Sequence, residues 1–146
     1  MIRNQKEFDE ALRRVRADEE FMAEQRKALE SMGLSAEEVE RGMQPAMSFH
    51  CQLLEEVDWY TRVRQRDFET IHSLTVVGRL LIAGRIANGL SQKDLAERLG
   101  VAEAQVSRDE RNEYHGITVD RAQRIFDALN EKISMTLDEQ PLALVG

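Results

Sequence analysis

Residues 74–130 consist of four short amphipathic segments separated by glycine-containing breaks, and this pattern constrains the fold most. The first segment, 74–87, stops at Asn88-Gly89, and the second, 92–99, stops at Gly100. Asn-Gly and single glycines commonly end helices, because glycine adopts the left-handed backbone conformation without strain. A third helix is expected over about 102–111, then a loop over 112–117, and Thr118 is a candidate N-cap for a fourth helix.

The spacing of apolar residues supports four helices rather than strands. Apolar side chains recur every three or four positions, as expected for one buried helix face. The expected inward positions are Val77, Leu80, Leu81, Ala83, Ile86, Leu95, Ala96, Leu99, Val119, Ala122, Ile125, Phe126 and Leu129. Scarce proline and abundant Ala, Leu, Glu and Arg also favour an all-α protein. Two short helices joined by a glycine turn predict a helix-turn-helix.

The sequence GLSQKDLAERLGVAEAQVSRDERN, continuing into TVDRAQRIFDALN, resembles the XRE, or phage-repressor, type of helix-turn-helix transcriptional regulator. The matching positions are Gly89-Leu90-Ser91-Gln92, Leu95-Ala96, Leu99-Gly100-Val101, Val106-Ser107-Arg108 and Glu110-Arg111. The resemblance covers under 40% of the chain. It implies that the 102–111 helix lies in the major groove of double-stranded DNA.

The resemblance also implies roles for individual side chains. The base-reading positions are Glu103, Ala104 and Arg108, with Gln105 and Ser107 beside them. An arginine here can bind guanine through two hydrogen bonds, and a glutamate can accept one from cytosine. Gln92 is expected to contact a phosphate, and Lys93, Arg111 and Asn112 are candidates for further contacts to the DNA backbone.

The same resemblance pairs Arg85 with Glu110 as an ion pair that supports the fold and reads no base. Two positions depart from the family pattern. Ala102 replaces the usual Ser or Thr cap, which removes about 1 kcal/mol of capping. Asp109 stands where an apolar side chain often packs, so we expect it either to face solvent or to pair with an arginine.

The front of the chain predicts a helical hairpin over residues 1–70, followed by the 71–131 DNA-binding domain and a 132–146 tail. Asn4 with Glu7 starts a helix that Gly33 ends, and about 28 residues span roughly 42 Å. Ser35 and Glu38 form a second capping box before a short helix that Gly42 interrupts. Pro45 then opens another long helix, with Phe49, Leu53, Val57, Tyr60 and Val63 on one stripe.

Two interpretations of this hairpin stay open. It either folds as a local hairpin, or it pairs with a second copy or a different protein to complete its core. The tail alternates apolar Ile133, Met135 and Leu137 with polar residues, which indicates a short strand. Two such tails could pair across a two-fold axis. The alternative is a frayed tail packed on the helices.

Charge and composition exclude other classes of protein. Residues 1–70 carry 16 acidic and 11 basic side chains, whereas residues 75–125 carry seven and eight, so the acidity lies in the front half. We expect no enzyme activity, no cofactor and no metal site, because adjacent His50 and Cys51 diverge on a helix and no metal-binding spacing exists. The absence of a long apolar run excludes a membrane span, and the single cysteine favours the cytoplasm.

These observations predict a sequence-specific transcriptional regulator, most simply a homodimeric repressor that reads a palindromic operator. The alternative is an antitoxin-type protein whose acidic front half neutralises a basic toxin while the other half represses the shared operon.

Overall fold

The computed structural model describes residues 1–138 and contains helices without strands over this range. The helices are α1 (Gln5–Ser31), α2 (Ala36–Arg64), α3 (Val77–Ala87), α4 (Gln92–Leu99), α5 (Glu103–Arg111) and α6 (Val119–Ala128). A 3₁₀ turn, η1 (Leu74–Val76), precedes α3. The all-α prediction is confirmed. None of the helices in the described range is long and apolar enough to cross a bilayer.

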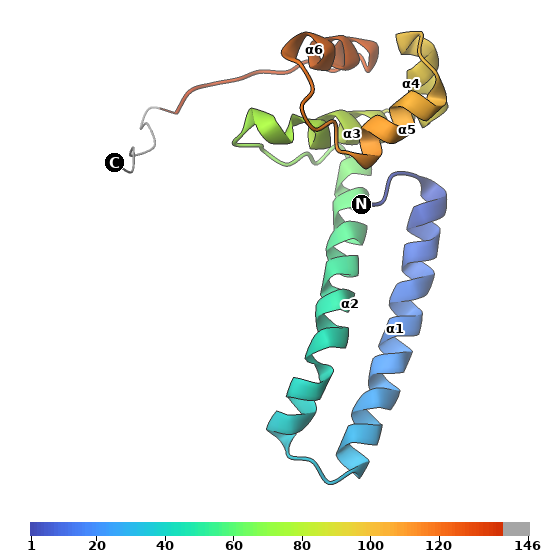
Figure 1. The fold of residues 1–146 in the computed structure, drawn as a ribbon, viewed down its shortest axis with the longest axis vertical. Helices are drawn as coiled ribbons and strands as arrows, with labels where there is room; N and C mark the ends of the chain where they lie inside the picture. The colour runs from blue at the N-terminus through green and yellow to red at the C-terminus, as the bar shows by residue number, and fades with distance from the viewer. Residues whose placement is uncertain (139–146) are drawn as a thin grey trace.

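Helices α1 and α2 form a long antiparallel hairpin, and α3 to α6 gather at its open end (Figure 1). Side-chain caps begin both long helices as predicted. Asn4 accepts a hydrogen bond from the Glu7 N–H at 2.9 Å. Ser35 and Glu38 form a reciprocal capping box. Each cap satisfies backbone N–H groups that the first turn of a helix leaves unpaired.

The prediction that Gly42 and Pro45 divide the second arm into two helices is wrong. Helix α2 is continuous through both residues. Gly42 packs closely on α1, because a Cβ atom there would lie 3.0 Å from the Leu29 side chain. Pro45 is exposed. Solvent at this position can bond the carbonyl group that Pro45 deprives of its helical partner, so the helix continues through the proline.

The helix-turn-helix boundaries agree with the sequence analysis. Ser91 and Asp94 form a capping box at the start of α4. Gly100 ends that helix in the left-handed conformation, with φ at 67°. Thr118 accepts a hydrogen bond from the Arg121 N–H at 3.2 Å and so caps α6. Ala102 makes no side-chain cap at α5, as its methyl group requires.

The buried core is continuous from the bundle into the hairpin. Ile82, Leu95, Val106, Ile125 and Leu129 fill its centre with almost no exposure. The open end of the hairpin contributes Ile2, Ala11, Tyr60 and Val63 to the same cluster. Phe8 stacks on Tyr60 with ring centroids 4.9 Å apart. The open end of the hairpin is therefore packed against the bundle.

A few expected inward positions are exposed instead. Val119 is 76% exposed because it is the first residue of α6 and lies beyond the edge of the core. Phe49, expected on the α2 stripe, is 67% exposed. The described part of the tail, residues 131–138, has no regular secondary structure, so the possible short strand does not form within one copy of the chain over this range. A strand needs a neighbour for its backbone groups. The rest of that predicted segment, 139–146, lies outside the described residues.

A buried ion pair joins α3 to α5. The Arg85 Nε and Nη2 groups each donate to a Glu110 carboxylate oxygen at 2.6 Å. Both residues are only 2% exposed. Arg85 also donates to the carbonyl oxygens of Leu90 at 2.7 Å and Arg3 at 3.0 Å. The guanidinium group thus connects α3, α5, the loop before α4 and the segment that precedes α1.

Glu110→Ala should lower the free energy of unfolding by about 3–5 kcal/mol, because it leaves the Arg85 charge buried without its partner. Urea denaturation followed by circular dichroism measures the loss. Asp67→Asn is the matched control, since it removes an exposed pair with Arg62 and should shift the midpoint far less. Equal shifts for the two variants would contradict a dominant role for the buried pair.

Gly78 allows α3 to pass directly under the loop that follows α5. A Cβ atom at this position would lie 1.9 Å from the carbonyl oxygen of Glu113. Glu113 and Tyr114 both have positive φ, at 50° and 53°. The loop is therefore already held in an uncommon backbone conformation, and it has little freedom to move away from a larger residue.

Gly78→Ala should lower the free energy of unfolding by about 1–3 kcal/mol, because the methyl group meets rigid backbone. Gly84→Ala in the same helix is the control. Its nearest neighbour is a side-chain atom, Leu129 Cδ1 at 3.2 Å, which can shift. Thermal unfolding of both variants tests the difference, and a Gly78→Ala protein as stable as Gly84→Ala would refute the close approach.

Candidate nucleic-acid interface

Helices α4 and α5 are held at a fixed angle by a short turn with a buried inner side. The Val101 N–H donates to the Ala96 carbonyl at 3.0 Å across the turn at Gly100. Leu95 and Ala96 on α4, and Val106 on α5, face the core. Because these apolar side chains occupy the inner faces, the polar residues of α5 are left on its outer face.

The predicted base-reading residues occupy that outer face. Glu103, Ala104 and Arg108 are exposed, whereas Gln105 and Ser107 are half-buried. Glu103 lies in the first turn of α5, where the helix dipole favours its negative charge. The structure therefore brings the five positions together on one short helix, with three of them freely accessible.

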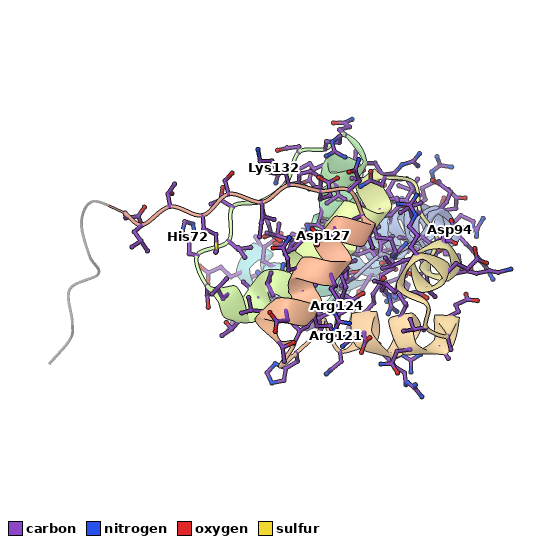
Figure 2. The ribbon with its side chains drawn as sticks, turned by 90° about the horizontal axis from the view of Figure 1, so that it is seen from above. His72, Asp94, Arg121, Arg124, Asp127 and Lys132 are labelled. Carbon is purple, nitrogen blue, oxygen red and sulfur yellow. The ribbon has the colours of Figure 1, made fainter. Side chains whose placement is uncertain are left out.

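A polar network positions Arg108. Its Nη2 group donates to Gln105 Oε1 at 3.1 Å. The Gln105 amide in turn donates to both carboxylate oxygens of Asp109, at 3.1 and 3.2 Å. Asp109 also pairs with Arg121 of α6, which is one of the two expected outcomes for that residue. Arg121 and Arg124 lie on α6 in Figure 2, and Asp94 lies well away from them at α4.

The predicted contacts to the DNA backbone lie around the ends of α4 and α5. Gln92 is half-buried at the first position of α4, and its amide donates to Glu110 Oε1 at 3.3 Å. An amide nitrogen carries two N–H groups, so Gln92 retains a donor for a phosphate. Lys93 is exposed beside it, and Arg111 and Asn112 are exposed at the end of α5.

Burial and hydrogen bonding perturb two titratable groups near this surface. The Ser91 backbone N–H and hydroxyl hold the pKa of Asp94 below its ordinary value, so the capping box stays charged. Burial raises the pKa of the Tyr114 hydroxyl well above its usual range, with Glu110 and Asp109 adding to the effect. Tyr114 therefore stays neutral beneath the loop that follows α5.

Sequence reasoning missed two contributors. Arg121 anchors Asp109 from 12 residues further along the chain, and the Arg3 carbonyl reaches Arg85 from 82 residues before it. Contacts at such separations leave no local signal. The departure of Asp109 from the family pattern indicated a possible arginine partner but did not identify Arg121. The contact from Arg3 is made by its backbone carbonyl, which every residue type has, so the sequence carries no signal for it.

His50 and Cys51, the adjacent pair considered in the sequence analysis, lie on α2 of the hairpin and not at this surface. Cys51 is exposed, and His50 lies between the hairpin arms 3.8 Å from Glu19. Residues 1–138 contain no group of three His, Cys, Asp or Glu side chains placed to hold a metal ion.

Comparison with known proteins identifies the second half of the chain. The helix-turn-helix family model matches residues 81–135, which span most of α3, all of α4 to α6 and the start of the tail. Searches of curated proteins and of solved structures return no match to this chain. The family is one of DNA-binding regulatory domains, not of enzymes. Residues 81–135 are thus a helix-turn-helix domain of the XRE family, and the chain that carries it is a DNA-binding regulator.

Proposed function

We propose that the protein is a sequence-specific transcriptional repressor that reads its operator with α5. The observation that carries this proposal is the outer face of α5, where Arg108 is exposed and held by Gln105. A side chain fixed in this way loses less conformational freedom on binding a base. The role requires the compartment that holds the DNA, in agreement with the cytoplasmic location expected from the sequence.

The contacts divide into base recognition and anchoring. Arg108 is proposed to donate to guanine O6 and N7, and Glu103 to accept from cytosine N4. Ala104 and Ser107 lie close enough on the helix to contact bases beside them. Gln92, Lys93, Arg111 and Asn112 are proposed to hold phosphates, which fixes the register of α5 in the groove. Arg85 and Glu110 are too deeply buried to touch DNA and support the fold.

We also propose a homodimer, because one short recognition helix covers only a small stretch of DNA. Two copies related by a two-fold axis would place their α5 helices about one turn of DNA apart, and so read a palindrome. The net charge of −7 does not exclude this, because residues 75–125 are close to neutral. Electrostatic attraction to DNA requires only a local balance that favours the phosphates.

The second candidate is an antitoxin-type protein that neutralises a basic toxin and represses the shared operon. The acidic hairpin favours it, because opposite charges steer partners together. A small basic protein encoded beside this one supports the antitoxin, and an unrelated neighbourhood supports the plain repressor.

Arg108→Ala should weaken binding to the selected operator by tenfold or more, because a bidentate arginine–guanine contact discriminates by about 1–3 kcal/mol. In vitro selection from random duplexes first defines the wild-type consensus, and titration of both proteins against it measures the loss. Arg41→Ala, on the exposed hairpin, is the matched control and should bind as the wild type does. A folded Arg108→Ala protein with unchanged consensus and affinity would remove α5 as the reading helix.

Deletion of residues 133–146 should abolish a dimer in solution if the tails pair across the two-fold axis. The deletion starts after Lys132 because Glu131 belongs to the fold: it accepts from Arg66 at 2.8 and 3.0 Å and from Asn88 at 2.7 Å. Sedimentation equilibrium gives the mass. An unchanged dimer mass after deletion would eliminate the tail as the interface.

A further inference from the structure

We propose that the distal half of the hairpin, residues 18–54, is a docking surface for a basic amphipathic helix of another protein. This surface lies at the opposite end of the hairpin from α3 to α6, as Figure 1 shows. The inference does not depend on DNA recognition by α5.

Cross-hairpin contacts establish the register of the two arms. Glu19 lies 3.8 Å from His50, and Arg26 pairs with Glu40 at 2.5 Å. Position 19 thus lies level with 50, and 26 lies level with 40. This register places Phe21 of α1 and Phe49 of α2 at nearly the same height on the hairpin.

The helical rotation places these two phenylalanines on the same side. Each residue advances about 100° around a helix, so Phe21 lies about 200° beyond Glu19, and Phe49 lies about 100° before His50. A forward rotation of 200° is the same as a backward rotation of 160°, so both phenylalanines are rotated backward from the cross-hairpin residues. Because the arms are antiparallel, backward rotations on the two helices lead to the same face of the hairpin. That face is opposite the two cross-hairpin pairs. Phe21 is 61% exposed and Phe49 67% exposed. Met32, 11 residues beyond Phe21 and thus on nearly the same side of α1, is 70% exposed.

The distal half is also poorly packed inside. Val39 and Met43 are its only fully buried apolar residues among those described, whereas the open end of the hairpin shares the main core. Two buried polar atoms in the same stretch, Gln25 Oε1 and His50 Nδ1, have no hydrogen-bond partner within the protein. Buried polar atoms are normally paired. Two helices alone therefore leave this stretch incomplete, and a third helix against the phenylalanine face would cover it.

Charge decides which partner fits. Residues 18–54 hold eight acidic and three basic side chains, while the rest of residues 1–70 hold eight of each. The whole negative excess of the hairpin thus lies in the half that carries the exposed phenylalanines. A second copy would bring two such acidic surfaces together, and like charges in close apposition are unfavourable. A helix with apolar residues on one face and Lys or Arg at its flanks complements both features.

The test uses the full-length protein and two labelled 21-residue model peptides with identical leucine positions. One peptide carries lysine at its polar positions, and the other carries glutamate. Fluorescence anisotropy gives the affinity of each for the wild type and for Phe21→Gln/Phe49→Gln. The matched control is Leu74→Gln/Val119→Gln, which replaces two residues of the DNA-binding half that are 61% and 76% exposed.

We expect the lysine peptide to bind the wild type at least tenfold more tightly than the glutamate peptide, and to bind more weakly at high salt. Phe21→Gln/Phe49→Gln should lose at least tenfold, and the control variant should bind like the wild type. Equal binding by the phenylalanine variant would overturn the proposal, because charge alone would then attract the peptide. A wild-type dimer that Phe21→Gln/Phe49→Gln converts to a monomer would also overturn it, since a second copy would occupy the face. Operator binding by the same variants, measured separately, tests the proposed function independently.

Discussion

Arg85 and Glu110 meet at the point where the separate parts of the chain converge. Their carboxylate and guanidinium groups lie in a region with almost no exposure to water, so each charge depends on the other. Arg85 uses further N–H groups on the carbonyls of Leu90 and Arg3, and Glu110 also accepts from Gln92. One ion pair therefore sets the angle between α3 and α5, holds the start of α4 and fastens the segment before α1.

This arrangement gives the two ends of the molecule different physical character. The end near the ion pair is closely packed, and its loops leave little room, as Gly78 under the Glu113 carbonyl shows. A rigid support of this kind suits the proposed recognition helix, because small displacements of Arg108 would change which base edge it could contact. The far end of the hairpin has a thin interior and exposed aromatic residues, which suits a surface that is completed by binding.

Helix caps and apolar periodicity predicted the helices well where no tertiary contact opposed them. Capping residues such as Asn4, Ser35 and Thr118 began helices where expected, since a cap depends on residues only three positions apart. The rules failed where a tertiary contact outweighed them. Gly42 and Pro45 predicted a break in the second arm of the hairpin. Close packing of Gly42 against Leu29, and solvent access at Pro45, allow one helix to continue through both residues. Alternation in the tail read as a strand, yet residues 131–138 have no strand beside them.

The sequence by itself determined the all-α class and the helix-turn-helix, because periodicity and caps are short-range properties, and its resemblance to XRE regulators indicated the residues expected on the outer face of α5. The tertiary structure alone decided how Asp109 is satisfied, which atoms surround Arg85, and that Phe21 and Phe49 share one face of the hairpin. These features join residues between 12 and 82 positions apart. Only the folded chain brings such residues within reach of a hydrogen bond or of a common partner.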